Sequence, residues 1–353
     1  MKIGKLLLMA FSISLFVSCS NDDDNNDNTP KGDYDNGFFI LNEGSAGQGT
    51  VSFSSDDFSV FTKDAYTAAN GSDLLGKYAQ SIFFDGDKAY IIAGGSKVIN
   101  VVNRYTFKLV AKIDTGLLNP RYGVVKDGKA YVTNANTYAD WGASATAPGN
   151  TDDYVAVIDL ATNKFESKID LNATANRIVE KNGKLYITES YTSSKLLVVN
   201  IAAKSLEAPI TIGLSADTME EKDGILYILR SPYTDRSEIV KVKLSDKTIS
   251  KITFPEALDG AGYMDIYNDK IYYTVSNSVY SINTNATAAS TTPIVTASTV
   301  ANLYGFAVNN DRIYVADSGD YKADSKAYIY NLTGTLQKEL TVGVGPNGFY
   351  FNN

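Results

Sequence analysis

The sequence contains no histidine and a single cysteine, Cys19, among its 353 residues. Without histidine it cannot form a Ser-His-Asp or Cys-His catalytic group, a histidine ligand for haem, or an ordinary zinc site. A disulfide within the chain is impossible because only one thiol is present. We therefore expect a protein that is not an enzyme and that requires no cofactor.

Basic residues are also few: 32 Lys and Arg face 40 Asp and Glu, which gives a net charge of −8 and a pI near 4.8. A nucleic-acid partner requires a basic stripe that displaces counterions, so we expect no such partner. Helix start and stop signals are scarce, whereas Tyr and Gly are abundant, with 24 and 27 copies. This composition predicts an almost entirely β structure.

A tight turn followed by alternating aromatic and β-branched residues recurs along the chain. The clearest copy is KDGKAYVTNAN at residues 126–136, and weaker copies start near residues 35, 84, 180, 221, 267 and 309. Such a turn feeding such a run is typical of a β-hairpin. Each copy has an anchor aromatic, and these are Phe39, Tyr90, Tyr131, Tyr186, Tyr227, Tyr272 and Tyr314. Their spacing of roughly 41 to 55 residues is that of a propeller blade, so seven copies predict seven blades.

The third copy predicts four strands, at residues 122–126, 130–134, 154–160 and 165–170. The first copy begins at its second strand, residues 38–41, whereas residues 345–353 form an inner strand that has no blade of its own. We therefore predict an all-β fold for residues 35–353, a seven-bladed β-propeller of four-stranded antiparallel blades. The C-terminal strand completes blade 1 and closes the ring, which removes unpaired strand edges.

The first 34 residues differ from the rest. Residues 1–18 combine Lys2 and Lys5 with an apolar run too short to span a bilayer, which is typical of a signal peptide. The segment LFVSC, ending at Cys19, resembles a bacterial lipobox, although Phe16 departs from the usual leucine. This resemblance implies an acylated Cys19, followed by a disordered acidic tether over residues 19–34.

The run Asp22 to Asp24 resembles the surface-export signal of Bacteroidota lipoproteins, and a solvated spacer is the alternative. These segments predict a lipid-anchored protein of the outer membrane, exposed at the cell surface, with the periplasmic leaflet as the open alternative. Contact with the membrane is expected through the lipid anchor only.

The expected loops fall into two sets on opposite rims of the disc. Turns between first and second strands, such as Asp127-Gly128, are minimal, whereas the loops near residues 42–49, 136–153 and 230–237 are long. Long loops in compact domains are more often functional. Trp141, the only tryptophan, is the first residue to test. The predicted ligand-binding residues are the aromatic and arginine residues of the elaborated rim: Tyr78, Arg121, Tyr122, Tyr138, Trp141, Arg177, Tyr191, Arg230, Tyr233, Tyr263, Tyr304 and Tyr321.

Tyr131-Val132-Thr133-Asn134 matches the repeat motif of the YVTN-type β-propeller family, which the chain resembles from about Gly37 to Asn353. Together with the lipobox-like segment and the NEG sequence at Asn42 to Gly44, the chain resembles the Bacteroidota surface lipoproteins that capture corrinoids. This resemblance implies a bound corrinoid, such as vitamin B12, and a TonB-dependent outer-membrane transporter as partner. We expect the propeller to be monomeric.

Two other functions stay open at this point. One is a glycan- or protein-binding adhesion module, and the other is a metal-dependent hydrolase or lactonase. For the second, Glu43, Asn134 and Glu189 follow second strands and carry oxygen ligands. Carboxylates such as Asp317 could also hold a hard cation, but no complete calcium-loop pattern is present, so we predict no metal site.

Overall fold

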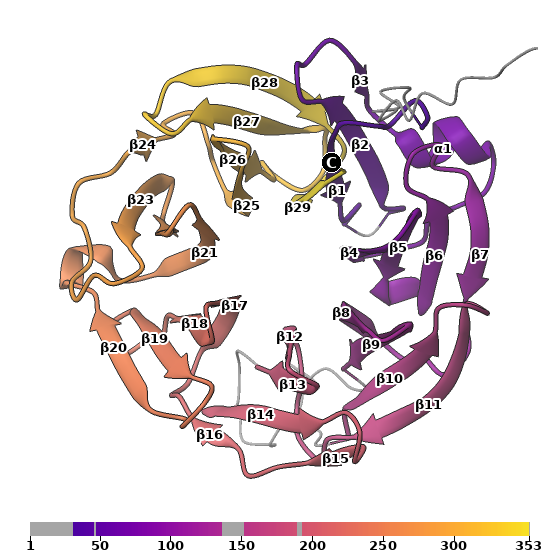
Figure 1. The fold of residues 1–353 in the computed structure, drawn as a ribbon. Coiled ribbons are helices and arrows are strands. Elements are labelled where there is room, and N and C mark those ends of the chain that lie inside the picture. Colours follow the sequence, from indigo (N-terminus) through magenta and orange to yellow (C-terminus); the bar gives the residue numbers. More distant parts are fainter. Residues whose placement is uncertain (1–30, 46, 136–151, 189–192, 353) are drawn as a thin grey trace, which may run out of the picture. The chain divides into compact units, whose positions relative to one another are not determined.

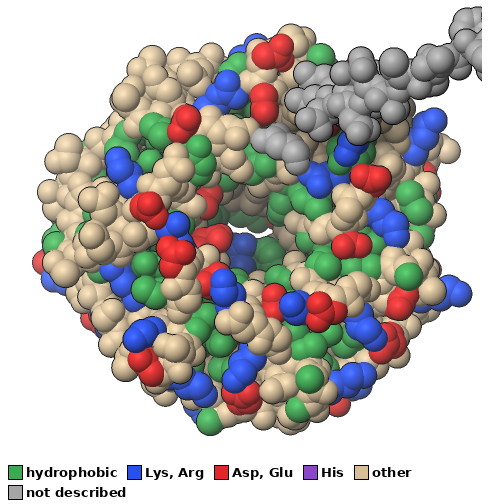
Figure 2. Space-filling model, in the orientation of Figure 1, with side chains coloured by type: hydrophobic (Ala, Val, Ile, Leu, Met, Phe, Trp, Pro, Cys, Tyr) green, Lys and Arg blue, Asp and Glu red, His purple; other side chains and the backbone are tan. Residues whose placement is uncertain are grey.

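Seven antiparallel sheets stand as blades around a central channel (Figures 1 and 2). The computed structural model describes residues 31–45, 47–135, 152–188 and 193–352. The predicted all-β class and seven-bladed propeller are confirmed. Within these described ranges, no helix combines the length and apolar character needed to cross a bilayer. The predicted signal peptide, Cys19 and most of the predicted tether lie outside the described residues.

Four strand positions build each blade from the channel outward. Blade 1 contains β29 (Pro346–Phe351), β1 (Gly37–Asn42), β2 (Thr50–Ser55) and β3 (Phe61–Thr62). Blade 2 contains β4 (Ala79–Asp85), β5 (Lys88–Ala93), β6 (Val98–Asn103) and β7 (Leu109–Ile113), and blade 3 contains β8 (Pro120–Lys126), β9 (Lys129–Asn134), β10 (Tyr154–Asp159) and β11 (Lys164–Asp170). Blade 4 contains β12 (Ile178–Lys181), β13 (Lys184–Ile187) and β14 (Lys195–Asn200), with its outer position split between β15 (Ser205–Leu206) and β16 (Ile210–Thr211).

The remaining blades follow the same plan. Blade 5 contains β17 (Ala216–Lys222), β18 (Ile225–Arg230), β19 (Glu238–Lys243) and β20 (Ile249–Thr253). Blade 6 contains β21 (Ala261–Tyr267), β22 (Lys270–Val275), β23 (Ser278–Asn283) and β24 (Val295–Thr296). Blade 7 contains β25 (Leu303–Asn309), β26 (Arg312–Asp317), β27 (Ser325–Asn331) and β28 (Leu336–Val342).

The predicted tight turns join the inner strand to the second strand in blades 2 to 7. In blade 3, Asp127 and Gly128 have φ of 50° and 72°, and in blade 6, Asn268 and Asp269 have φ of 46° and 59°. Positive φ at both central residues defines the type I′ turn, which matches the twist of the flanking strands. Asp, Asn and Gly occupy these positions because they tolerate the left-handed region best.

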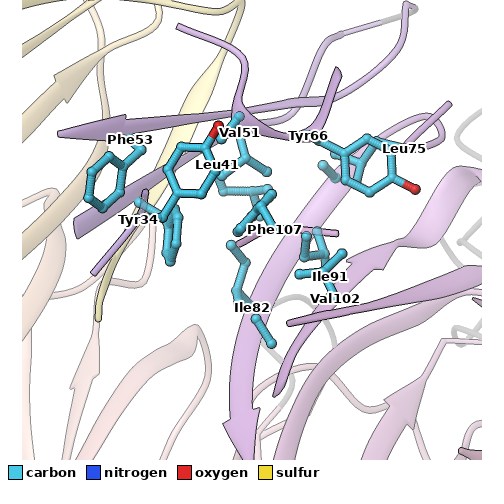
Figure 3. Packing of buried hydrophobic residues seen from close by; sticks show 14 residues of the cluster. Tyr34, Leu41, Val51, Phe53, Tyr66, Leu75, Ile82, Ile91, Val102 and Phe107 are labelled. Atoms are coloured by element: carbon cyan, nitrogen blue, oxygen red, sulfur yellow. The ribbon is translucent and has the colours of Figure 1, made fainter. Parts of the chain in front are cut away.

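Aromatic and aliphatic side chains fill the spaces between neighbouring blades. All seven anchor aromatics are buried, from Phe39 and Tyr90 at 0% exposure to Tyr131 and Tyr186 at 5%. Figure 3 shows the cluster between blades 1 and 2, where residues of both sheets interdigitate. Both faces of a blade are therefore covered, which explains why the central strands do not alternate with charged residues.

The C-terminal strand β29 closes the ring as predicted. It pairs antiparallel with β1, with Phe39 opposite Tyr350 and Ile40 opposite Phe349. It also contacts β25 of blade 7 and β4 of blade 2, so the inner strands form an uninterrupted circle. The first strand of the described propeller and the last are thus hydrogen-bonded, and unfolding of either one opens the ring.

The two rims differ as expected. The plain rim carries the two-residue turns and most turns between third and fourth strands, whereas the elaborated rim carries the connections from second to third strand and between blades. One exception is blade 6, where the long connection is residues 284–294 on the plain rim. Another difference is the short helix α1 (Ala65–Asn70) after β3, where a loop was expected; Asp64 caps it by accepting from the Thr67 backbone N–H.

Candidate ligand site at the axial mouth

The inner strands share a β-bulge near the elaborated rim. In β8, Pro120 pairs with Asn134 and Gly123 pairs with Val132, so two residues oppose one. The same shift occurs in β4, β17, β21, β25 and β29, while Arg177 directly precedes β12 at the equivalent place. A bulge redirects a side chain at the edge of a sheet. At this bulge, or at its equivalent in blade 4, each blade carries one side chain that can form hydrogen bonds. We name this set the mouth ring: Asn347, Gln80, Tyr122, Arg177, Thr218, Tyr263 and Tyr304.

All seven mouth-ring side chains can form hydrogen bonds, and all are half-buried. Several bonds pass from one blade to the next. Asn347 donates to the Ala79 carbonyl at 2.8 Å, and Gln80 donates to the Tyr122 hydroxyl at 2.7 Å. These bonds link blades 1, 2 and 3 at the opening of the channel. We call the series of contacts between neighbouring blades at this level the belt.

Arg177 continues this belt from blade 3 to blade 5. Its guanidinium lies 4.2 Å from the centre of the Tyr122 ring and donates to Asp217 at 3.2 and 3.4 Å. A guanidinium over an aromatic face is a favourable cation–π arrangement. Although burial opposes its charge, Asp217 and Tyr122 raise the pKa of Arg177 above its ordinary value, so the cation is permanent.

Tyr263 and Tyr304 carry the belt from blade 6 to blade 1. The Tyr263 hydroxyl donates to the Tyr304 carbonyl at 2.8 Å, and the Tyr304 hydroxyl donates to Glu43. Tyr321 packs edge-on against Tyr304, with ring centres 5.1 Å apart, and its hydroxyl accepts from Asn302. This side of the mouth is consequently aromatic, with its hydroxyl groups fixed in direction.

The belt is interrupted between blades 5 and 6. Among the described residues, the Thr218 hydroxyl has no hydrogen-bond partner although it is sealed from solvent. An open hollow of about 900 Å³ lies at the same blade boundary and is lined by Asp217, Asp259 and the fully exposed Tyr233. A second hollow of about 430 Å³ shares Gly260 with it and is lined by Tyr263 and Asn302. The mouth therefore has lateral space where its side chains are least tied to one another.

Two carboxyl groups lie deeper on the inner strands, below this gap. Glu220 on β17 and Asp265 on β21 occupy equivalent positions, opposite the anchor aromatics Tyr227 and Tyr272. Burial and the neighbouring Asp265 raise the pKa of Glu220, with Arg177 opposing them, and burial raises the pKa of Asp265. Asp265 accepts from the Val308 backbone N–H at 2.7 Å.

The structure brings together several of the residues predicted for the site. Tyr122, Arg177, Tyr263 and Tyr304 belong to the mouth ring, and Tyr321 adjoins it. Arg121 also lies at the mouth, where its Nε donates to the Asn176 side chain at 3.1 Å.

Other predicted residues lie elsewhere. Tyr78 is 47% exposed on the elaborated rim of blade 2. Arg230 is buried at the end of β18, where it pairs with Glu238 and donates to the Leu214 carbonyl at 3.1 Å. Its guanidinium is thus used within blade 5. Tyr138, Trp141 and Tyr191 lie outside the described residues.

Sequence reasoning missed Gln80, Thr218 and Asn347 in the ring, and Glu220 and Asp265 below it. In blades 2 to 7 the mouth-ring residue stands nine or ten positions before the anchor aromatic of its own blade. Aligning the repeats on their anchor aromatics would have found this position. The bulge that exposes it leaves no other signal in the sequence.

The residues considered for a metal have other partners. Glu43 accepts from Tyr304, and the buried Asn134 accepts from the Leu118 backbone N–H at 3.2 Å. Asp317 accepts from the backbone N–H groups of Ala301 and Asn302. Within the described part of the chain, no three Asp, Glu or Cys side chains are grouped closely enough to hold a metal ion. Glu189 lies outside that part.

Comparison with known proteins supplies a family and the fold. The family model described as Domain of unknown function (DUF5074) matches residues 36–263, more than half of the chain. A search of curated proteins finds no match. The matches do not confirm the resemblance to YVTN-type repeats or to corrinoid-capturing lipoproteins.

Three solved structures illustrate the likeness of the fold. A functionally unknown protein from Desulfotomaculum acetoxidans DSM 771 has a TM-score of 0.67 at 12% identity, with 90% of this chain and 98% of that chain covered. Dihydro-heme d1 dehydrogenase NirN in complex with DHE has a TM-score of 0.59 at 15% identity, covering 91% and 76%. The computationally designed Ika8 protein has a TM-score of 0.57 at 7% identity, covering 92% of each chain. At these identities the likeness is one of fold alone.

Proposed function

The chain belongs to the family described as Domain of unknown function (DUF5074), which names no activity, and we propose from the site itself that the protein binds a small ligand at its axial mouth. The ligand is rich in N–H and O–H donors and enters from the elaborated rim. It lies against the mouth ring and extends into the hollow between blades 5 and 6.

One observation carries this proposal: each blade carries a polar side chain at the bulge position of its inner strand, and six of these seven side chains, all except Thr218, contact a neighbouring blade. Ligand sites combine aromatic walls with a few directed polar groups, and the mouth offers both. Acidic side chains outnumber cationic ones there, because Asp217, Glu220 and Asp265 share the region with Arg121 and Arg177. A ligand that donates hydrogen bonds suits these acceptors better than an anion does.

A corrinoid satisfies this description. Its broad ring is rimmed with carboxamides, whose N–H groups suit carboxylate and tyrosine acceptors while aromatic faces cover the apolar part. In this proposal the protein is an outer-membrane lipoprotein anchored through Cys19, exposed at the surface, and it delivers the corrinoid to a TonB-dependent transporter. The dehydrogenase in complex with DHE shares only the fold, at 15% identity, so it carries no argument about the ligand.

Titration of the purified protein with cyanocobalamin, followed by visible absorbance and calorimetry, tests the proposal. Wild type should bind. Tyr122→Ala should weaken binding by about 1 to 3 kcal/mol, the usual range for a central aromatic contact. Tyr267→Ala is the matched control, because Tyr267 is another half-buried tyrosine of an inner strand, with its hydroxyl near Asp311 on the plain rim.

Equal affinities of Tyr122→Ala and Tyr267→Ala for cyanocobalamin would show that the ligand does not bind at the mouth. Absence of cyanocobalamin binding would reject the corrinoid. Binding to a glycan array would then favour the adhesion module, and lactone hydrolysis that stops on addition of a chelator would favour the hydrolase.

A further inference from the structure

The first described residues, 31–36, pack against the plain rim and form hydrogen bonds with it. The Tyr34 side chain is buried between blades 1 and 2, with its ring 5.2 Å from Phe53 and 5.6 Å from Phe107 (Figure 3). Its backbone N–H donates to the Tyr105 carbonyl at 2.9 Å, and Asn352 donates to its carbonyl at 2.6 Å. The segment before β1 is therefore a fixed part of the propeller.

The partners of this segment identify the rim. Tyr105 belongs to the turn between the third and fourth strands of blade 2. Asp56 belongs to the equivalent turn of blade 1, and its backbone N–H donates to the Asn36 carbonyl. Lys31 lies over the Tyr105 ring at 4.7 Å. All these contacts are on the plain rim, so the chain enters the propeller on the side opposite the mouth ring.

We infer that the plain rim faces the membrane and that the axial mouth opens away from it. This orientation rests on the proposed anchoring through Cys19. Eleven residues lie between Cys19 and Lys31, and the twelve residue steps from one to the other can span at most about 40 Å. A seven-residue inner strand such as β21 is about 23 Å long, so passing the height of one blade uses more than half of that reach.

The orientation decides how a partner meets the mouth. A ligand arriving from the surrounding solution reaches the mouth directly. The mouth can contact a transporter embedded in the same bilayer only if the propeller turns over. The tether opposes this reversal, because it joins the propeller on the plain rim. The mouth is thus built to load ligand from outside, and delivery requires either this reversal or a transporter surface that projects above the disc.

Energy transfer from labelled propeller to labelled bilayer tests the orientation. The chain has no cysteine besides Cys19, so an introduced cysteine provides the one labelling site once Cys19 is acylated. Ser245→Cys marks the plain rim of blade 5, and Tyr233→Cys marks the elaborated rim of the same blade; both positions are exposed. The full lipidated protein is inserted into phosphatidylcholine vesicles whose headgroups carry an acceptor dye.

Higher transfer from residue 245 than from residue 233 is expected. Equal transfer, or higher transfer from residue 233, would overturn the orientation while leaving the anchor intact. Flotation with the vesicles provides the separate check on anchoring, with Cys19→Ser as the control that should not float. Wild type that fails to float would overturn both the anchor and the orientation. Ligand binding at the mouth would be unaffected by that result, because the cyanocobalamin titration tests it separately.

Discussion

Removing the carboxylate of Glu238 should destabilise the propeller far more than removing an exposed carboxylate nearby. Glu238 accepts from Arg230, from Lys251 at 2.9 Å and from Thr253 at 3.1 Å. The Arg230 and Glu238 side chains are only 7% and 12% exposed. Glu238→Gln leaves the buried Arg230 charge with only the exposed Asp235, 3.9 Å away, as a counter-ion, and loss of one partner of a buried pair costs about 3 to 5 kcal/mol. We expect about 3 kcal/mol, because the amide keeps one acceptor oxygen.

Glu256→Gln is the matched control. Glu256 pairs with Arg236 at 3.1 Å, but its side chain is 85% exposed. Exposed ion pairs contribute about 0 to 1 kcal/mol, so this variant should unfold almost like wild type. Urea unfolding monitored by circular dichroism gives both differences. Similar losses for the two variants would refute the reasoning that burial determines the cost.

The same pair predicts a dependence on pH. Burial opposes the charge of Glu238, but hydrogen bonds from Lys251 and Arg230 prevail and hold its pKa below the usual value. A lowered pKa means that the ionised group stabilises the fold above the pKa of the unfolded chain, near 4.3 for glutamate. The gap between wild type and Glu238→Gln should be full above about pH 5 and should shrink as the pH falls through the lowered pKa.

Two further substitutions test the channel and the closure. Burial and Asp265 raise the pKa of Glu220, so the neutral carboxyl group favours folding and the stability of wild type falls as the pH rises through that pKa. Glu220→Gln should therefore have a higher urea midpoint than wild type at pH 9 and the same midpoint near pH 4. A difference that stays constant with pH would contradict this prediction. Phe349 of β29 is 7% exposed, and its ring centre lies 5.4 Å from that of Tyr314. Phe349→Ala should therefore lower the free energy of unfolding in urea by about 3 to 5 kcal/mol, whereas Leu336→Ala, at an exposed position, should lower it by less than about 0.5 kcal/mol. Equal losses would argue against β29 as the closing strand.

The fold was predictable because its signals are local and repeated. A turn such as Asp127-Gly128 next to an anchor such as Tyr131 specifies one hairpin, and seven copies specify the number of blades. The closure followed from two matching defects, a first repeat without its inner strand and a final strand without a blade. The split outer strand of blade 4 and the long plain-rim loop of blade 6 were not predictable, because their short outer strands carry no periodic pattern.

The site was predictable only in part, because its geometry depends on register. Tyr122, Tyr263 and Tyr304 attract attention as aromatic residues near expected loops, whereas Gln80 and Asn347 resemble any polar surface residue. Their shared position arises from the bulges, which are visible only when strands are paired. Register also decides the place of Arg230, since β18 and β19 set it directly opposite Glu238. Residue type alone could not separate it from the arginine of the mouth ring.

Hydrogen exchange with and without cyanocobalamin tests the central claim most directly, because it locates the ligand along the chain. The mouth ring predicts slower exchange in peptides around the bulges, near residues 79–81, 121–123 and 262–264. Peptides covering the plain-rim turns, such as residues 223–224 and 310–311, should exchange at unchanged rates. Protection confined to the plain rim or the outer strands, with none at the bulges, would contradict a ligand site at the axial mouth.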